Sequence, residues 1–261
     1  MTVDRDAARR RRRGLSSFII ATIVVLALVA GFFLADAGVR NYAENRAKDE
    51  IAAHLPDSVT GDVSVSIGGL SAIAQYLTGS FDRVTLTAPA LSVDGVPASV
   101  HLVATDVPVD QAKSVGDVRG TVDLDQTALN TLLAAALPTG APAANLVLGD
   151  GTVQYQGSVS VLGRNVGYQA TATPTAEADS LLFTPSNATI TTGAGTVDAT
   201  AILPLVLGKQ PIRVCVARYL PEGVNLAGVD VTPGRARITL ESSTLMLTTQ
   251  SLTTLGTCSA G

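Results

Sequence analysis

The stretch "VSIGGLSAIAQYLTG", Val65–Gly79, holds a strand pattern, a turn and a helix pattern within fifteen residues. It begins with alternating apolar residues and serines, turns at Gly68 and Gly69, and continues as a short uncharged apolar segment that ends at Gly79. Alternation with a period of two is typical of a strand, and apolar residues three and four apart are typical of a helix that packs on a neighbouring surface. The stretch therefore predicts a domain in which strands and helices pack together.

Strand patterns dominate the chain after this stretch. Residues 81–109 alternate valine, leucine and alanine with threonine on either side of Asp94 and Gly95, which predicts a hairpin of long strands. From residue 145 on, turn sequences separate further alternating segments, at 149–151, 163–165, 193–195 and 233–234. The predicted fold class is α+β: one domain with a long curved antiparallel β-sheet wrapped around a few amphipathic helices.

Two further segments have helical periodicity. Residues 38–55 place apolar side chains at intervals of three or four between charged ones, and Pro56 ends the pattern. In "LDQTALNTLLAAALP", Asp125 is the expected N-cap and Pro138 the stop before a linker over 139–144. One face of this predicted helix carries Leu129, Leu132, Leu133, Ala136 and Leu137.

The N-terminal sequence is typical of a membrane anchor. Five arginines, Arg9 to Arg13, precede residues 15–35, and 21 helical residues are long enough to cross a hydrocarbon core of about 30 Å. The positive-inside rule places the arginines in the cytoplasm. The chain then divides into a cytoplasmic tail (1–14), a single transmembrane anchor (15–35) and an extracytoplasmic domain (36–261). The competing interpretation is a signal peptide that is cleaved near Ala37.

Charge and cysteine content fit an exported domain. Without residues 1–14, the chain has 12 basic and 20 acidic residues and a net charge of −8, which disfavours nucleic acid as a partner. The only two cysteines, Cys215 and Cys258, suggest a disulfide that ties the C-terminal segment to the sheet. Two free thiols are the alternative.

The sequence contains few candidate catalytic residues. His54 and His101 are the only histidines, and neither lies in a catalytic or metal-binding motif. Asp123 and Asp125 form a carboxylate pair directly before the predicted second helix, where capping and the helix dipole already account for them. The sequence therefore predicts a protein that is no enzyme and needs no metal or cofactor.

The most informative remaining feature is the arrangement of aliphatic residues. Helices faced with leucine and alanine and long alternating strands, with only 4% aromatic residues, could enclose an elongated hydrophobic cavity that suits acyl chains. A solid core would produce the same pattern.

Val65–Gly79 resembles the signature of the LmeA-like family of phospholipid-binding envelope proteins of actinobacteria. That signature reads Val-x-Ile-x-Gly-Phe-Pro-Phe-Leu-x-Gln-x-Leu-x-Gly, with a valine five residues further on. The positions that match in register are Val65, Ile67, Gly69, Gln75, Leu77, Gly79 and Val84. The sequence departs from the signature at its centre, where 70–73 read Leu-Ser-Ala-Ile in place of Phe-Pro-Phe-Leu.

The resemblance implies a cell-envelope protein that binds phospholipid, including phosphatidylinositol-type lipids, and supports envelope lipid or lipoglycan maintenance. Two sets of residues are then candidates for a lipid site. The expected lining of the groove is Leu70, Ile73, Leu77, Leu129, Leu132, Leu133 and Leu137. The headgroup candidates are Arg213, Arg218, Arg235 and Arg237, with Lys209 nearby. The alternative function is a scaffolding envelope protein with a solid core and no ligand.

Overall fold

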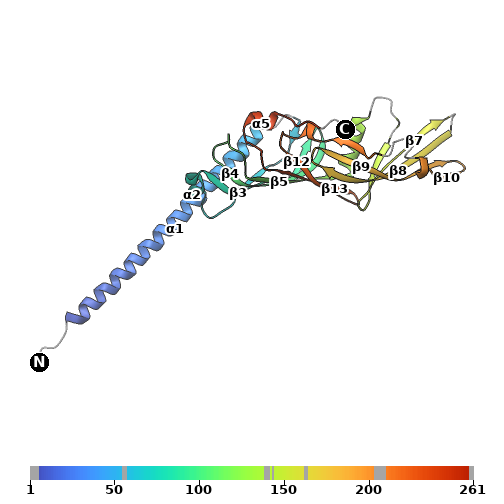
Figure 1. Cartoon of the computed structure of the whole chain (residues 1–261). Coiled ribbons are helices and arrows are strands. Elements are labelled where there is room, and N and C mark those ends of the chain that lie inside the picture. The colour runs from blue at the N-terminus through green and yellow to red at the C-terminus, as the bar shows by residue number, and fades with distance from the viewer. Residues whose placement is uncertain are drawn as a thin grey trace.

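The computed structural model describes residues 6–54, 58–137, 142, 144–161, 164–202 and 210–258. The molecule is elongated (Figure 1). Helix α1 (Asp6–His54) projects from one end of a β-rich domain, and strand β10 (Gly195–Asp198) lies at the opposite end. The side chains of the arginine run lie outside the described part.

Seven strands form the first sheet, and all the pairings are antiparallel. Its order is β1-β3-β4-β5-β13-β12, with β2 also paired to β3. The strands are β1 (Val59–Thr60), β2 (Ser64–Ile67), β3 (Ser80–Val93), β4 (Val96–Pro108), β5 (Asp117–Asp125), β12 (Asn225–Thr232) and β13 (Arg235–Ser242). The predicted hairpin is β3–β4: Asp94 and Gly95 have φ of 52° and 79°, as a type I′ turn requires at both positions.

A second antiparallel sheet has the order β10-β9-β8-β7-β6, with β11 also paired to β9. Besides β10 its strands are β6 (Ala144–Leu148), β7 (Val153–Val161), β8 (Arg164–Glu177), β9 (Ser180–Thr192) and β11 (Ile212–Cys215). The predicted α+β class with antiparallel strands is confirmed, but the strands divide between two sheets rather than forming one. The predicted turn at 163–165 begins outside the described residues.

The described helices besides α1 are short: α2 (Ala72–Thr78), α3 (Gln126–Ala136), α5 (Thr249–Thr253) and the 3-10 turns η1 (Thr200–Ile202) and η2 (Ala217–Tyr219). The segment expected as a separate helix over 38–55 is the last part of α1, which continues from the apolar segment without a break. Asp125 caps α3 as predicted and accepts a hydrogen bond from the Ala128 amide at 2.7 Å. Pro138 lies outside the described residues.

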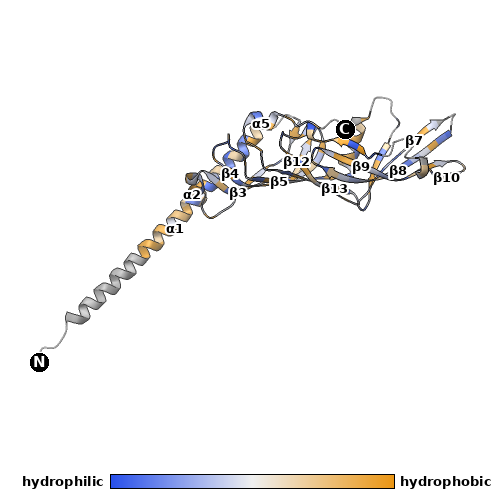
Figure 2. Ribbon diagram, in the orientation of Figure 1, coloured by the Kyte–Doolittle hydropathy of each residue, from blue (hydrophilic) through white to orange (hydrophobic). Residues whose placement is uncertain are grey.

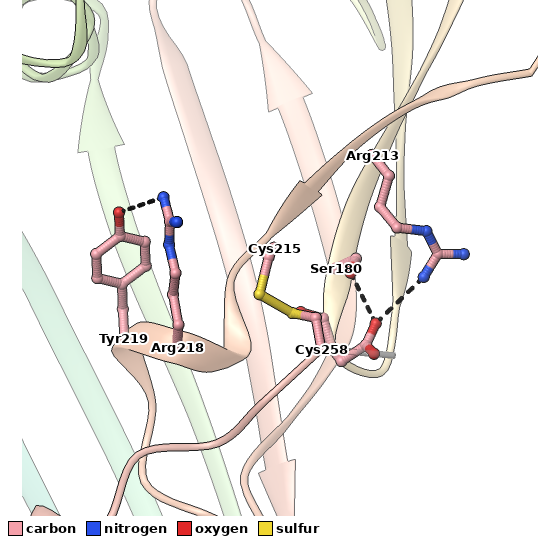
Figure 3. The surroundings of a disulfide bond; sticks show 7 residues. Ser180, Arg213, Cys215, Arg218, Tyr219 and Cys258 are labelled. Carbon is pink, nitrogen blue, oxygen red and sulfur yellow. Dashed lines mark hydrogen bonds and ion pairs between the residues drawn. A yellow bond between two sulfur atoms is a disulfide. The ribbon is translucent and has the colours of Figure 1, made fainter. Parts of the chain in front are cut away.

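A disulfide joins Cys215 of β11 to Cys258, as predicted (Figure 3). Because β9 is the one described strand that pairs with β11, the bond attaches the C-terminal segment to the edge of the second sheet. The Cys258 sulfur also lies 3.1 Å from the Asp179 carbonyl oxygen, at the turn before β9.

The two sheets meet at a buried cluster formed by Leu148 of β6, Val231 of β12 and Ala236 of β13. Leu129 of α3, Val153 of β7 and Val229 of β12 pack against this cluster. Helix α3 therefore lies at the junction between the sheets.

Candidate functional site

One face of the first sheet is almost entirely aliphatic. Register and alternation assign Val84, Leu86 and Ala88 of β3 to the same face as their partners on the neighbouring strands. We call this the apolar sheet face; it comprises those three residues with Val100, Leu102, Ala104, Val118, Val122, Leu124, Ile238 and Leu240. The opposite face carries threonines, His101 and charged side chains. The sheet is thus amphipathic across four adjacent strands.

The apolar sheet face is incompletely covered. Ala88 is 1% exposed, but the valine, leucine and isoleucine side chains of this face on β3, β4, β5 and β13 all remain partly exposed. Aliphatic residues at the centre of a solid core are normally fully buried. The protein therefore leaves a broad aliphatic surface only partly buried by its own side chains.

The second sheet continues this surface. Leu148 and Val153 pair with each other on its apolar face, and both belong to or pack on the cluster at the sheet junction. Further along the same face, Tyr155 stacks on Tyr168 with ring centroids 5.9 Å apart. Burial and then the hydrogen bond and charge of Tyr168 raise the pKa of Tyr155. The apolar faces of the two sheets are thus continuous through the cluster.

Helix α3 is held over the junction by two polar side chains. Asn130 donates to the Leu146 carbonyl at 3.0 Å and accepts from the Leu146 amide at 2.7 Å, so it pairs with the edge of β6 as a neighbouring strand would. The Gln126 side chain accepts from the Leu148 amide at 3.0 Å. The roles of Gln126 and Asn130 were not predicted from the sequence, although the two residues are four positions apart and so share a helix face.

The predicted lining residues fall into two separate groups. On α3, Leu129 packs at the sheet junction, Leu133 and Leu137 are partly buried, and Leu132 is 43% exposed. The α2 group lies beside α1 instead: Ile73 is partly buried, whereas Leu70 and Leu77 are 91% and 79% exposed. The structure does not bring the two groups together.

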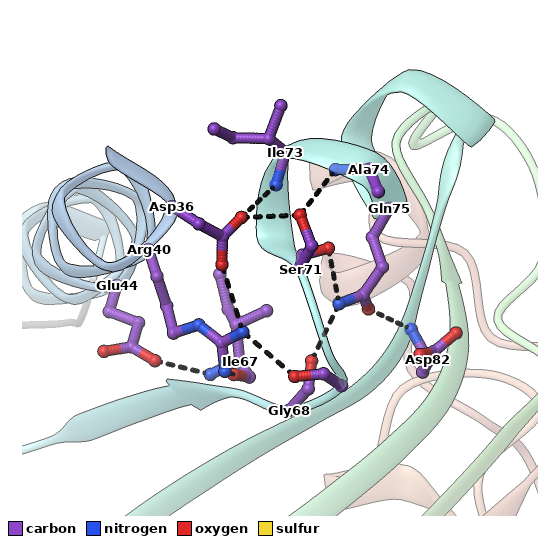
Figure 4. Close-up of polar contacts among 11 residues, drawn as sticks. Asp36, Arg40, Glu44, Ile67, Gly68, Ser71, Ile73, Ala74, Gln75 and Asp82 are labelled. Carbon is purple, nitrogen blue, oxygen red and sulfur yellow. Dashed lines mark hydrogen bonds and ion pairs between the residues drawn. The ribbon is translucent and has the colours of Figure 1, made fainter. Parts of the chain in front are cut away.

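Three successive turns of α1 hold the signature stretch (Figure 4). Asp36 accepts from the Ser71 hydroxyl at 2.7 Å and from the Ile73 amide at 2.9 Å. Arg40 donates to the carbonyls of residues 67 and 69 at 2.8 and 2.9 Å, and Glu44 accepts from the residue 67 amide at 2.7 Å. The segment expected to be amphipathic, 38–55, includes Arg40 and Glu44 but not Asp36. The spacing of four between these three charged residues was the available signal that they act together.

The carboxylate of Asp36 should make the packing of α2 on α1 depend on pH. Its hydrogen bonds, from the Ile73 amide first and the Ser71 hydroxyl second, lower its pKa from 3.8 to about 2. A lowered pKa stabilises the folded state above pH 3.8, and this contribution is lost as the pH falls toward 2. We expect Asp36→Asn to lower the thermal midpoint of the full chain at pH 6 and to have little effect at pH 2. A difference that does not change with pH would contradict this assignment.

The arginine candidates do not form one cluster. Arg213 pairs with Glu177 at 2.8 Å and with Asp179 at 3.4 Å. Arg237 pairs with Asp123 at 2.8 Å, and this partner raises the pKa of the guanidinium. Arg218 is exposed and stacks over the Tyr219 ring, and Arg235 is exposed on β13. Lys209 lies outside the described residues.

The candidate catalytic residues whose side chains are described take part in structural contacts. Asp123 is the partner of Arg237, and Asp125 caps α3. His101 is exposed on the polar face, where its Nδ1 lies 3.1 Å from the Thr87 hydroxyl. The side chain of His54 is not described. Within the described ranges, no three histidine, cysteine or acidic residues gather in a group that could hold a metal ion.

A family model described as LmeA-like phospholipid-binding matches residues 34–241, which include α2, both sheets and α3. Searches among curated proteins and among solved structures gave no match. The matched range begins at the last turn of the apolar segment and covers most of the chain. The suspected relationship is confirmed, and the chain belongs to the LmeA-like phospholipid-binding family.

Proposed function

We propose that this protein is a non-catalytic phospholipid-binding protein of the cell envelope that holds acyl chains against the apolar sheet face. The observation that carries the proposal is the partial exposure of aliphatic side chains across β3, β4, β5 and β13. Family membership supplies the class of ligand. Support of envelope lipid or lipoglycan maintenance is the role that follows for such a carrier.

The chemistry of the apolar sheet face suits an acyl chain. Its backbone groups are already paired in the strand ladders, so the surface offers mainly methyl and methylene groups to a ligand. Each buried methylene of a lipid contributes about 0.8 kcal/mol, so ten methylenes contribute about 8 kcal/mol before the cost of ordering the chain. This apolar contact does not depend on electrostatic attraction. An acidic domain would not attract an anionic lipid.

Membrane attachment is the second part of the proposal. Helix α1 contains the one candidate membrane span among the described residues, within Ile23–Ala53. We propose that residues 15–35 cross the membrane once, with 1–14 in the cytoplasm and 36–261 outside it. The arginine run supports this orientation, and the Cys215–Cys258 disulfide supports an oxidising location for the domain.

The headgroup is proposed to bind through arginine, and phosphatidylinositol-type lipids are included among the ligands. Arg218 and Arg235 are the better candidates, because a phosphate at Arg213 or Arg237 would compete with carboxylates that already pair with them.

The proposal is tested with the full chain in vesicles that contain a phospholipid bearing a photoreactive diazirine in its acyl chain. After irradiation and proteolysis, we expect cross-linked peptides from β3–β5 and β13 in addition to peptides from the α1 span. Within β4, the adducts should fall on Leu102 and Ala104 rather than on Val103, which the alternation assigns to the polar face.

Cross-links confined to α1 would mean that the anchor is in the bilayer but that no acyl chain reaches the sheet. That result would support a scaffolding protein without ligand. The adducts on α1 act as an internal standard, because they depend on insertion alone.

A further inference from the structure

Three large apolar side chains on and beside α2 point away from the protein. Leu70 is 91% exposed, Leu77 79% and Tyr76 61%. We call these three residues the α2 patch. Leu70 is among the most exposed large apolar residues of the described chain, although the residues on either side of it are firmly bound to α1. A rigidly held patch of this kind marks a contact surface.

The position of Leu70 along α1 can be bounded from its neighbours. Gly69 is bound by Arg40, and Ser71 is bound by Asp36. These two α1 residues lie one and five positions beyond residue 35, which at about 1.5 Å per residue is about 1.5 to 7.5 Å past the end of the proposed span. The polar layer on each side of a hydrocarbon core is about 5 to 8 Å thick. Leu70 is therefore at the height of the lipid headgroups.

The arrangement of the domain agrees with this height. Figure 1 shows α2 at the end of the domain where α1 leaves it, with β10 at the far end. Figure 2 shows that the described part of α1 stays hydrophobic up to the level of α2. The α2 patch is thus at the end of the domain from which the apolar part of α1 leaves.

We propose that the α2 patch lies in the headgroup region of the extracytoplasmic leaflet and holds the domain against the membrane surface. Leucine inserts its side chain toward the acyl chains at this depth, and tyrosine is a residue that favours the membrane interface. The contact places the β2–β3 end of the apolar sheet face next to the bilayer. The inference rests on the anchor in the proposed function, but not on acyl-chain binding by the sheet.

The chain contains no tryptophan, so single tryptophans report on chosen positions without background. The full chain is reconstituted in phosphatidylcholine vesicles with and without phosphatidylcholine brominated on its acyl chains. Leu70→Trp and Leu77→Trp probe the patch, and Phe33→Trp reports on the span. Val197→Trp is the matched control, because Val197 is also an exposed aliphatic residue, 64% exposed, on β10. Circular dichroism verifies that each variant keeps its fold.

We expect Leu70→Trp and Leu77→Trp to emit at shorter wavelength than Val197→Trp and to lose at least about half as much fluorescence to brominated lipid as Phe33→Trp loses. Quenching as weak as in Val197→Trp, with Phe33→Trp still quenched, would overturn the proposal and leave the anchor standing. A blue shift without quenching would mean that protein covers the patch, and this also overturns it. An unquenched Phe33→Trp would remove the anchor and the inference with it.

Discussion

Phenylalanine at position 104 should displace lipid from the apolar sheet face. Ala104 lies between Val84 and Val118 in the aligned register, and its small side chain is partly exposed. A phenyl ring there would take the place of about two to three methylenes of a ligand, at about 0.8 kcal/mol each. We therefore expect Ala104→Phe to weaken lipid binding by about 2 kcal/mol, which is roughly 30-fold. The measurement is the yield of photoadducts on β4, β5 and β13 relative to those on α1.

Thr105→Phe is the matched control for this variant. Thr105 is the next residue of β4, is also partly buried, and faces the polar side between Arg83 and Asp117. The same ring on that side should leave the photoadduct yield on the sheet unchanged. Equal losses in both variants would point to a general disturbance of the sheet, and no loss in either would show that acyl chains do not contact this face.

Removal of the disulfide should have the largest effect on stability. Cys215 and Cys258 are 43 residues apart in the sequence. Closing a loop of that length removes conformational entropy from the unfolded chain worth about 4 kcal/mol at 25 °C. We expect Cys215→Ser with Cys258→Ser to lower the free energy of unfolding of the full chain by about that amount in a denaturant titration in detergent.

Reduction of the wild type serves as the control for the serine variant. Dithiothreitol should destabilise the wild type to the same extent and should not affect the double variant. Serine substitution that costs less than about 1 kcal/mol would contradict this estimate of the disulfide's contribution. It would indicate instead that the segment from η2 to Cys258 contributes little to the cooperative unit that unfolds.

Several local features followed from residues close together in the chain. The β3–β4 turn was predictable because aspartate and glycine tolerate the positive φ that a type I′ turn needs. The N-cap of α3 was predictable because a carboxylate three residues before a free amide satisfies it. The disulfide followed from two cysteines in a domain predicted to be exported, and the family from the spacing of Val65–Gly79.

The two sheets could not be read from the same patterns. Alternation shows which residues of a strand share a face, but not which strand becomes its neighbour. The pairing of β5 with β13 joins residues more than a hundred positions apart, such as Asp123 and Arg237. The same limit applies to the apolar sheet face: its residues were visible as apolar alternations, but their partial exposure depends on what the other elements cover.

The signature stretch, Val65–Gly79, shows what local sequence determines and what depends on tertiary structure. Its residue pattern determines a strand, a tight turn at glycines and a short apolar helix, because these depend on neighbouring side chains and backbone angles. Only the tertiary structure decides that Asp36, Arg40 and Glu44 bind the stretch to α1 and leave Leu70 and Leu77 outside. The reason is that the same apolar helix pattern fits a face buried in a core and a face held against a membrane. Which of the two forms depends on the position of the helix, and charged residues distant in the sequence fix that position.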